Sequence, residues 1–489
     1  MNKTFAPLLS LWLAAVAPGG WAAEPTKTVL TYHATADRAG NYVVPALTWE
    51  RVSSLHPDTG FHAQIDGHVY AQPLYWRGGD GQPGRLLVAT ENNMVTALDA
   101  STGMTLWQRS LGHPVPRAAL PCGNIDPLGI TGTPVIDAQS QTVFLDAMML
   151  DGPTPQHELF ALSLKDGSIR PGWPVNVAAR LASQGLAFTA RNQNQRGALT
   201  ILGDRVYVPY GGHFGDCASY HGWVVGVRLS DPQAVTSWHT SASAGGIWAP
   251  AGISSDGHAL FVATGNTMDA TTWGGGEAVL RLDPALSFSG AANDFFAPSN
   301  WRELDESDAD LGGVAPVLFD IGDAELALAL GKDGKAYLLD RRNLGGLAGS
   351  LLAEQVSDQP IRTAAADYPT ADGMMIAFQG SGIDCPSGPA DLTVLRVRAG
   401  KPPSLDTAWC ASLRGAGAPM VTTTDGKTDP IVWILGAEGD NRLYGFRGDT
   451  GERLFMSAPL PGLRHFGTLI ATQDHLYVAA DDTVFAFAF

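Results

Sequence analysis

The sequence predicts an all-β protein folded as an eight-bladed β-propeller of four-stranded antiparallel blades. Glycine and proline are abundant, at 57 and 32 residues, whereas only 16% of the chain is charged. This balance is typical of turn-rich β proteins. Short alternating apolar strands are separated by turn-forming residues along most of the chain. The same pattern recurs with a period of about 40–65 residues, which is the period of propeller blades.

Each repeat consists of an alternating strand, a turn and a second strand that often carries a large residue. The clearest copy is VTALDASTGMTLW, from Val95 to Trp107. Further copies begin at Phe160, Val224, Val279, Ala336, Val394, Tyr444 and Val484. The last copy has no partner strand after it, so we expect the extended segment Phe61–Ile65 to supply one and close the ring, which removes exposed sheet edges. A seven-bladed ring or a pair of β-sandwiches is the alternative.

The first residues have the pattern of a secretory signal. A positively charged start precedes an apolar run, Phe5–Val16, that is too short to span a membrane, and small residues follow at Gly20–Ala23. We therefore expect a signal peptide over residues 1–23 and a single propeller domain over residues 24–489, which is periplasmic or secreted. No cysteine precedes Cys122, so we expect no membrane anchor.

Cysteine usage and charge narrow the classes of ligand and partner. Export permits disulfide bonds, and four cysteines allow three pairings. We expect Cys385–Cys410, within one repeat, and Cys122–Cys217, which would cross-link two loops. The sequence has no CxxCH motif, so we expect no haem on this chain, and it has no CxxC motif that would favour zinc. The net charge of −17 argues against nucleic acid or an anionic membrane surface as a partner.

The longest polar connections are expected on one face of the ring. In a propeller, the loops between second and third strands and those between blades share a face, and such loops usually carry function. The most informative stretch is Gly245–Asp283, which contains Trp248 and the polar connection 266–273, beginning at Asn266. The others are residues 91–93, 121–125, 191–196, 213–223, 305–310, 332–333 and 438–441.

These repeats and loops resemble the PQQ-type propeller of the quinoprotein alcohol dehydrogenases over nearly all of the chain after the signal segment. GGIWAPAGISSDGHALFVATGN is similar to the family segment whose tryptophan forms the floor beneath the quinone and whose asparagine ligates calcium. The resemblance thus implies Trp248 as the floor and Asn266 as a metal ligand. A tricyclic quinone needs a flat aromatic face, and calcium needs oxygen ligands.

Two further segments carry the resemblance into the chemistry. LDESDADLGGVAPVLFD, residues 304–320, is similar to the segment that bears the catalytic base. Asp308 is its best match and Asp310 is the neighbour, and the sequence leaves the choice between them open. GKDGKAYLLDR, residues 331–341, is similar to the segment whose Lys or Arg contacts the quinone carbonyl, which implies this role for Lys332. Asp308 would take a proton from an alcohol while Lys332 stabilised charge on the reduced quinone.

The sequence departs from the family pattern in two places. The family has a disulfide between adjacent cysteines over the quinone, but here Cys122 stands alone. The family also supplies a calcium-binding glutamate from the third blade, where this chain offers His213 or Asp216. Aspartate is the better calcium ligand, so the implied metal ligands are Asn266, Asp216 and Asp308.

A cluster of polar side chains is expected at the mouth of the ring, where the loop 213–223 meets the preceding segment RNQNQR. Its members are Arg191, Gln193, Gln195, Arg196, His213, Asp216, His221 and Trp223. Histidine and aspartate together suit a transition metal, whereas arginine and glutamine suit an anion. We expect Arg196 to contact the cofactor. A loop network pinned by Cys217 is the alternative.

Three functions stay open, each with a small-molecule site at the ring centre or a binding surface there. The principal prediction is a quinoprotein-like oxidoreductase of an alcohol-type substrate, which uses PQQ and calcium and passes electrons to a separate carrier. The second is a hydrolase similar to tetrathionate hydrolase, in which Asp308 activates the nucleophile and Arg196 or Lys332 holds an anionic substrate. The third is a non-catalytic scaffold or binding module, similar to the propeller of the outer-membrane assembly machinery.

Overall fold

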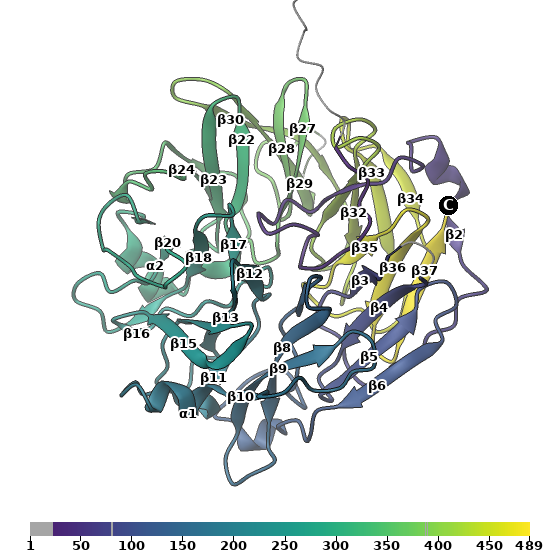
Figure 1. Ribbon diagram of the computed structural model, residues 1–489. Helices are drawn as coiled ribbons and strands as arrows, with labels where there is room; N and C mark the ends of the chain where they lie inside the picture. Colours follow the sequence, from purple (N-terminus) through teal and green to yellow (C-terminus); the bar gives the residue numbers. More distant parts are fainter. Residues whose placement is uncertain (1–22, 80–81, 387, 389) are drawn as a thin grey trace, which may run out of the picture.

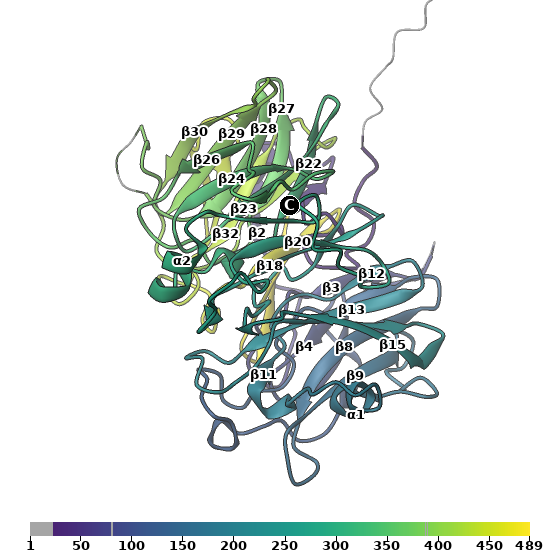
Figure 2. The same cartoon turned by 90° about the vertical axis from the view of Figure 1, so that its left-hand side faces the viewer.

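The chain forms a closed ring of β-sheets in the computed structural model, which describes residues 23–489 except 80–81, 387 and 389. Within these residues, the strands form eight antiparallel blades, each with a path of four strands, arranged around a central axis (Figures 1 and 2). The predicted eight-bladed β-propeller is therefore confirmed. The predicted signal peptide lies outside the described residues except for Ala23.

The first half of the ring follows the chain order of the strands. Blade 1 contains β3 (Leu74–Arg77), β4 (Gly84–Ala89), β5 (Met94–Asp99) and β6 (Thr105–Ser110), and blade 2 contains β7 (Val135–Asp137), β8 (Thr142–Met149), β9 (Gln156–Ser163) and β10 (Val175–Asn176). Blade 3 contains β11 (Gln193–Asn194), β12 (Thr200–Leu202), β13 (Arg205–Gly212), β14 (Trp223–Arg228) and β15 (Asp231–His239). Blade 4 contains β17 (Ser254–Ser255), β18 (Leu260–Thr264), β20 (Ala278–Leu282) and β21 (Phe295–Ala297).

The second half repeats this plan. Blade 5 contains β22 (Val317–Ile321), β23 (Ala324–Leu330), β24 (Lys335–Asp340) and β26 (Leu352–Gln355), and blade 6 contains β27 (Ala366–Thr370), β28 (Gly373–Gln379), β29 (Leu392–Arg398) and β30 (Ser404–Ala411). Blade 7 contains β31 (Met420–Thr423), β32 (Ile431–Leu435), β33 (Leu443–Arg447) and β34 (Arg453–Met456). Blade 8 contains β35 (Leu469–Ala471), β36 (His475–Ala480), β37 (Thr483–Ala488) and, from the start of the chain, β2 (His56–Pro57).

The remaining elements decorate the ring. Strand β1 (Asn41–Val43) pairs in parallel with β31, β25 (Gly346–Leu347) extends blade 4, and β16 (Ser243–Ala244) pairs with β19 (Thr267–Met268). The helices are α1 (Val177–Ala182) and α2 (Trp301–Ser307), with 3₁₀ turns η1 (Arg51–Ser54), η2 (Arg117–Ala119), η3 (Ala190–Asn192) and η4 (Leu311–Gly313). Helix α1 lies at the outer rim beside β10 and β15 (Figure 1).

The inner strands are buried on both faces because neighbouring blades pack face to face. All eight residues of β8 are buried, and so are all five residues of β18. Apolar side chains on both faces of a strand weaken the two-residue alternation that marks a half-buried strand.

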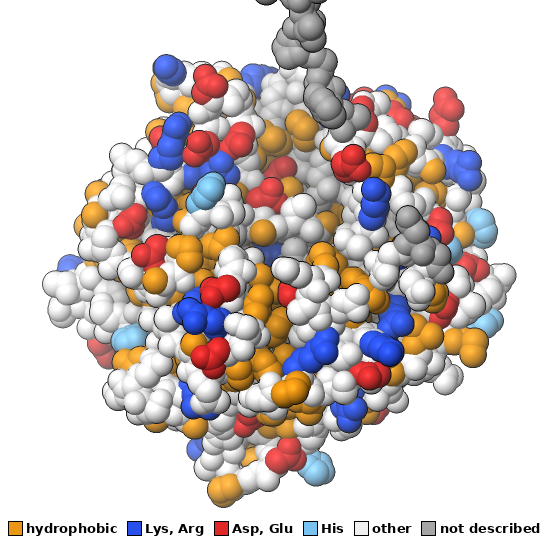
Figure 3. All heavy atoms as spheres, in the orientation of Figure 1, with side chains coloured by type: hydrophobic (Ala, Val, Ile, Leu, Met, Phe, Trp, Pro, Cys, Tyr) orange, Lys and Arg blue, Asp and Glu red, His pale blue; other side chains and the backbone are white. Residues whose placement is uncertain are grey.

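Acidic and basic side chains are interspersed on the face of the molecule drawn in Figure 3.

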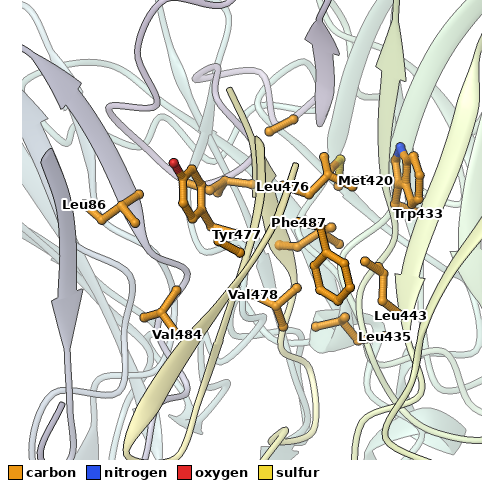
Figure 4. Close-up of a cluster of buried hydrophobic side chains, with 14 of the residues drawn as sticks. Leu86, Met420, Trp433, Leu435, Leu443, Leu476, Tyr477, Val478, Val484 and Phe487 are labelled. Carbon is orange, nitrogen blue, oxygen red and sulfur yellow. The ribbon is translucent and has the colours of Figure 1, made fainter. Parts of the chain in front are cut away.

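Ring closure uses a different segment from the one predicted. The segment Phe61–Ile65 is not a strand; β2 pairs antiparallel with β37 instead, with His56 opposite Ala488 and Pro57 opposite Phe487. Phe61 and Ile65 alternate with exposed residues because they pack on the core, not because they pair in a sheet. An alternating pattern shows only that every second residue is buried, and both a half-buried strand and an unpaired extended segment packed on the core produce it. The core is continuous across the closure, from Leu86 through Tyr477 to Trp433 (Figure 4).

A segment near the start of the chain, residues 29–44, crosses one end of the ring. Its backbone bonds to the innermost strands of blades 1, 2, 4, 5, 6 and 7, through Tyr75, Ile136, Ser255, Leu318, Asp367 and Val421. Arg38, which is buried, donates to the carbonyl of Leu199 beside blade 3 at 3.0 Å. The segment therefore ties the inner edges of seven blades together. Because these hydrogen bonds use backbone groups, residues 29–44 can form them with several different side chains.

Tyr32 fills the axis at the closed end. It packs within a ring of buried alanines contributed by successive blades: Ala198, Ala249, Ala251, Ala315, Ala364 and Ala418. Small side chains at these positions leave room on the axis for one aromatic ring. A cavity of about 10 Å³ separates Tyr32 from Arg196 and His465. The central channel therefore opens toward Arg196 and His465, and residues 29–44 close its other end.

Both predicted disulfides are present. Cys122–Cys217 joins the link between blades 1 and 2 to the long loop of blade 3, and Cys385–Cys410 lies within blade 6. Disulfides of this kind form in oxidising compartments. No helix among the described residues is long and apolar enough to cross a membrane.

Candidate functional site

The predicted polar loops surround a pocket at the open end of the channel, with a volume of about 670 Å³. This volume is in the range of small-molecule sites. Its polar and aromatic lining includes Asn124, Asn194, Arg196, His213, Asp216, Tyr220, Trp248, Asn266, Asp308, Asp310, Lys332, Arg362, Glu438, His465 and Phe466. A second hollow, of about 690 Å³, lies beside β37, and its ionisable lining side chains are Asp58 and His62. The first pocket is the one in which charged groups from many blades converge.

Asp310 is the anchor of one wall of this pocket. Its Oδ1 accepts the backbone N–H of Asn266 at 2.7 Å, and its side chain is buried. A Cβ atom on Gly265 would lie 2.5 Å from that same oxygen. Glycine at position 265 is therefore what lets the blade 4 backbone approach the carboxylate so closely. Burial raises the pKa of Asp310, and the charge of Lys332 opposes this rise.

Lys332 bridges two carboxylates above the indole of Trp248. Its Nζ lies 2.5 Å from Asp310 Oδ2, 2.7 Å from Asp308 Oδ1 and 5.4 Å from the centre of the Trp248 ring. Burial by itself lowers the pKa of Lys332, but the two carboxylates outweigh it, so the pKa is raised and the ammonium stays charged. A cation at this distance from an aromatic face is also held by the ring quadrupole.

The structure separates the two carboxylates that the sequence could not distinguish. Asp308 ends helix α2 in a left-handed conformation, at φ 53°, and its side chain is 68% exposed. The side chain of Asp310 is 4% exposed, and both its oxygens already accept hydrogen bonds or ion pairs. Asp308 is therefore the carboxylate that a ligand in the pocket can reach. Asp310 is placed to hold Lys332 and the Asn266 backbone.

Glu277 lies behind Asp310 and is fully buried. Its Oε2 accepts the N–H of Leu311 at 2.6 Å, while its Oε1 has no partner among the described residues. Burial, reinforced by the charge of Asp310, raises the pKa of Glu277 well above its usual value. Burial and the neighbouring Asp310 thus both favour the protonated form of Glu277.

Asp216 and Tyr220 form the opposite wall, on the long loop of blade 3. The hydroxyl of Tyr220 donates to Asp216 Oδ1 at 2.6 Å. Burial raises the pKa of Tyr220, and the charges of Asp216, Asp310 and Asp308 raise it further. The phenol is therefore a permanent hydrogen-bond donor beside three carboxylates.

Arg196 occupies the axial side of the pocket. Its Nη2 donates to His465 Nε2 at 2.8 Å, and His465 Nδ1 lies 2.8 Å from Glu438 Oε1. The guanidinium lies 4.9 Å from the centre of the Phe466 ring and 5.7 Å from that of Tyr70. Burial, aided by the charge of Arg196, lowers the pKa of His465, so the imidazole is neutral and carries its proton on Nδ1.

The predicted cluster at the mouth forms only in part. Arg196, His213 and Asp216 line the pocket, but Arg191, Gln193, Gln195, His221 and Trp223 do not. His221 instead binds the carbonyls of Thr240 and Ala242, and Trp223 is in the core. Burial lowers the pKa of His213 to about 4, and its Nε2 lies 3.0 Å from the Arg191 carbonyl. These residues pin the loop.

Several pocket residues escaped the sequence reasoning. Tyr220 lies within a predicted loop, and Glu277 lies behind the pocket wall, just after the loop 266–273; neither has a recognisable motif around it. Arg362, His465 and Phe466 come from links between later blades, which the repeat pattern did not mark as special. Their common signal is position in an inter-blade link, and only the closed ring brings such links together.

The oxygen donors of the pocket meet only part of what a calcium ion needs. Asn266, Asp216, Asp308 and Asp310 supply oxygen, as calcium requires. However, the described part of the chain contains no converging group of three His, Cys, Asp or Glu side chains. Lys332 also lies between Asp308 and Asp310, and Asp216 is bound to Tyr220. This arrangement does not fit a calcium ion unless Lys332 moves.

The pocket fits a flat anionic ligand better. The indole of Trp248 offers an aromatic face, and a Cβ on Gly313 would lie 3.4 Å from that indole, so the chain packs closely against one edge of it. Arg196 and Arg362 bring positive charge to one side of the same cavity, whereas Lys332 is already paired with Asp308 and Asp310. A planar quinone that carries carboxylates matches this combination of aromatic and cationic groups.

Comparisons with known proteins agree on the fold. The sequence matches no family model and no curated protein. A quinohaemoprotein alcohol dehydrogenase from Pseudomonas putida HK5 superposes with a TM-score of 0.67 at 14% identity, covering 95% of this chain and 80% of that one. A europium-containing methanol dehydrogenase superposes with a TM-score of 0.61 at 13% identity, covering 95% and 99%. BamB from Moraxella catarrhalis gives 0.51 at 16% identity, covering 89% and 100%.

These likenesses establish the class of fold. The chain has the eight-bladed propeller fold that the sequence resemblance predicted, and these dehydrogenase structures share its architecture. Within that class, it is similar to structures of alcohol and methanol dehydrogenases and to BamB. Because both catalytic and other proteins share the fold, the activity must be argued from the pocket.

Proposed function

We propose that this protein is a quinoprotein-like oxidoreductase that oxidises an alcohol-type small molecule in the pocket at the ring centre. The observation that carries the proposal is the stack of Trp248, Lys332 and Asp308 on one wall of that pocket. Such a reaction requires three groups from the protein: an aromatic surface, a fixed cation and a carboxylate that the substrate can reach.

Each of these residues has a distinct part in the proposal. Trp248 would hold one face of a planar quinone, and Lys332 would supply a hydrogen-bond donor and a positive charge that stabilise its reduced form. Asp308 accepts the hydroxyl proton of the alcohol through the oxygen that faces the pocket. Asp310 is a positioning residue, because it contacts Lys332 and the Asn266 backbone.

A bound quinone would supply the two-electron oxidant that takes hydride from the alcohol carbon. The proton of the hydroxyl goes to Asp308, so the alcohol loses two electrons and two protons and becomes a carbonyl. The electrons then leave through a separate carrier, since the sequence has no CxxCH motif. The disulfides and the predicted signal segment are consistent with a periplasmic or secreted protein.

The proposal routes no step through a metal. Asn266, Asp216 and Asp308 remain the predicted ligands, but Lys332 already forms ion pairs with both Asp308 and Asp310. Binding experiments should therefore be run with calcium, with a lanthanide and with a chelator. A quinone affinity that rises with metal would show that Lys332 gives way to an ion.

The first experiment is a titration of the stripped protein with PQQ, followed by tryptophan fluorescence and quinone absorbance. Saturable binding is expected, and Trp248→Ala should weaken it by about tenfold or more, since aromatic contacts are worth about 1–3 kcal/mol each. Lys332→Met should also weaken it. Lys335→Met is the matched control, because Lys335 is three residues away and does not line the pocket. Equal binding in all four proteins would contradict the proposal.

Turnover separates the two carboxylates. In protein loaded with PQQ and given a dye acceptor, Asp308→Asn should reduce kcat by about 10²–10⁴-fold while PQQ still binds. Asp310→Asn should instead weaken PQQ binding, because Lys332 loses its buried partner. If Asp310→Asn alone abolished turnover at unchanged PQQ affinity, Asp310 would be the base.

One observation favours the hydrolase as a second candidate. Arg196 forms no ion pair with a carboxylate in the part of the chain that the structure describes, so it is available to an anionic substrate. Product release from an anionic substrate without any electron acceptor would support the hydrolase. Absence of both reactions would leave the scaffold alternative.

A further inference from the structure

Two cations line the same pocket, and they differ in whether carboxylates pair with them. Lys332 is neutralised by two carboxylates at 2.5 and 2.7 Å. Arg196 is half-buried, and its side chain has one hydrogen-bond partner among the described residues, the neutral ring of His465. Glu91 and Glu438 act on the Arg196 charge only from a distance, without a direct ion pair among the described residues. A half-buried guanidinium without a direct ion pair is costly to maintain unless a ligand supplies the partner.

The surroundings hold Arg196 in one orientation. Phe466 and Tyr70 contact the guanidinium with their rings, at 4.9 and 5.7 Å between the guanidinium carbon and the ring centres. His465 accepts from Nη2 and is itself fixed by Glu438. These contacts occupy one Nη group of the guanidinium. The other guanidinium donors have no protein acceptor in the described residues, and the residue lines the cavity.

The chemistry of the free donors identifies the ligand class. A guanidinium fork matches the two oxygens of a carboxylate, and aromatic rings on its flanks favour a flat molecule. The nearest protein carboxylates are otherwise engaged: Glu438 binds His465, and Glu91 accepts from the N–H of Gly129 at 2.7 Å and the hydroxyl of Thr131 at 2.8 Å.

We propose that Arg196 is the anchor of an anionic subsite that binds the carboxylate of a planar organic acid. This subsite lies in the same pocket as the proposed oxidoreductase site, but it does not depend on redox chemistry. The carboxylate has two sources, an acidic quinone cofactor or an acidic substrate, and both present the same group to Arg196.

The test compares wild-type protein with Arg196→Gln by calorimetry, using benzoate, benzyl alcohol and PQQ as probes. Benzoate should bind more tightly than benzyl alcohol, because only benzoate carries a carboxylate for Arg196, and Arg196→Gln should leave the affinity for benzyl alcohol unchanged. Arg196→Gln should weaken benzoate by about 10- to 100-fold, as expected for a lost charge-assisted hydrogen bond. Arg191→Gln is the matched control, because it removes the same charge from an exposed position in the same segment. Binding of benzoate by wild type should also weaken as salt rises.

The outcomes assign the source of the carboxylate. If Arg196→Gln weakens PQQ and bound PQQ excludes benzoate, the carboxylate belongs to the cofactor. If PQQ affinity is unchanged and benzoate still binds beside it, the carboxylate belongs to the substrate. Benzoate binding without any PQQ binding would keep the subsite and remove the quinoprotein proposal. Equal affinity of wild type, Arg196→Gln and Arg191→Gln for every acid, or no salt dependence in wild type, would overturn the subsite.

Discussion

The two ends of the central channel are built by different means. At the closed end, residues 29–44 bond to the inner strands through the backbone, and Tyr32 packs in a ring of alanines. At the open end, long loops bring charged side chains together, and one of these loops is held by Cys122–Cys217. The same ring of blades is thus held together by backbone hydrogen bonds at its closed end and lined by varied charged side chains at its open end. The two ends can therefore be perturbed separately.

Removing Cys122–Cys217 should have the largest effect. The bond spans 95 positions, so the double variant Cys122→Ser, Cys217→Ser should lose about 4–5 kcal/mol of unfolding free energy in urea. The equivalent change at Cys385–Cys410, which spans 25 positions, should cost about 3–4 kcal/mol. Only the first pair should also weaken ligand binding, because its loop carries Asp216. Equal loss of binding in both variants would mean that the loop does not shape the pocket.

Tyr32 tests the closed end. Tyr32→Ala should lower the unfolding free energy by about 3–5 kcal/mol, as for other large buried aromatic residues. Tyr32→Phe should be nearly neutral, because the buried Tyr32 hydroxyl has no partner in the described residues. Thermal or urea unfolding measures both. A large cost for Tyr32→Phe would show that the hydroxyl is bonded in solution and that the two ends communicate through the axis.

Glu91 gives the open end a pH dependence. Burial raises its pKa to about 7, above the unfolded value, so the folded state holds the proton more tightly between about pH 4.5 and 7. Its contribution to stability should therefore fall as pH rises, by up to about 1.4 kcal/mol per pH unit. Urea unfolding at pH 5 and pH 7 should show wild type losing about 2–3 kcal/mol relative to Glu91→Gln. A constant difference between the two proteins would place the Glu91 pKa near its ordinary value.

Arg362 should have the smallest effect. It lines the pocket but is exposed, and salt screens exposed charges. Arg362→Gln should change benzoate affinity by less than about threefold at 0.15 M salt, with no change in stability. An effect as large as that of Arg196→Gln would show that charge at the rim, and not the oriented fork, selects the ligand.

Much of the fold followed from local patterns. The repeat predicted blade strands such as β5 and β14 because alternation and turn residues are properties of short segments. The closing strand was misplaced because Phe61 and Ile65 alternate for packing, whereas β2 has two residues and no pattern of its own. Both disulfide pairings were also predicted, from the position of the cysteines in the repeats.

The candidate site was predicted in part. Trp248, Asn266, Asp308 and Lys332 were expected in one pocket, and they do line one pocket. The segment around Asp308 could not be ranked against Asp310, because two acids two residues apart look alike in sequence. Their difference in exposure, 68% against 4%, comes from the end of helix α2 and the close approach of Gly265. Their chemical roles remain predictions.

The sequence by itself determined the class of fold, the number of blades and the residue types available at the pocket, because these depend on local periodicity and on composition. The tertiary structure decided which cations are neutralised, which acid is buried and which end of the channel is closed. Those properties depend on how the loops of neighbouring and distant blades pack together in three dimensions. Lys332 and Arg196 are equivalent charges in the sequence, and only the folded ring gives one of them two carboxylates from an adjacent link and leaves the other beside His465, facing the cavity.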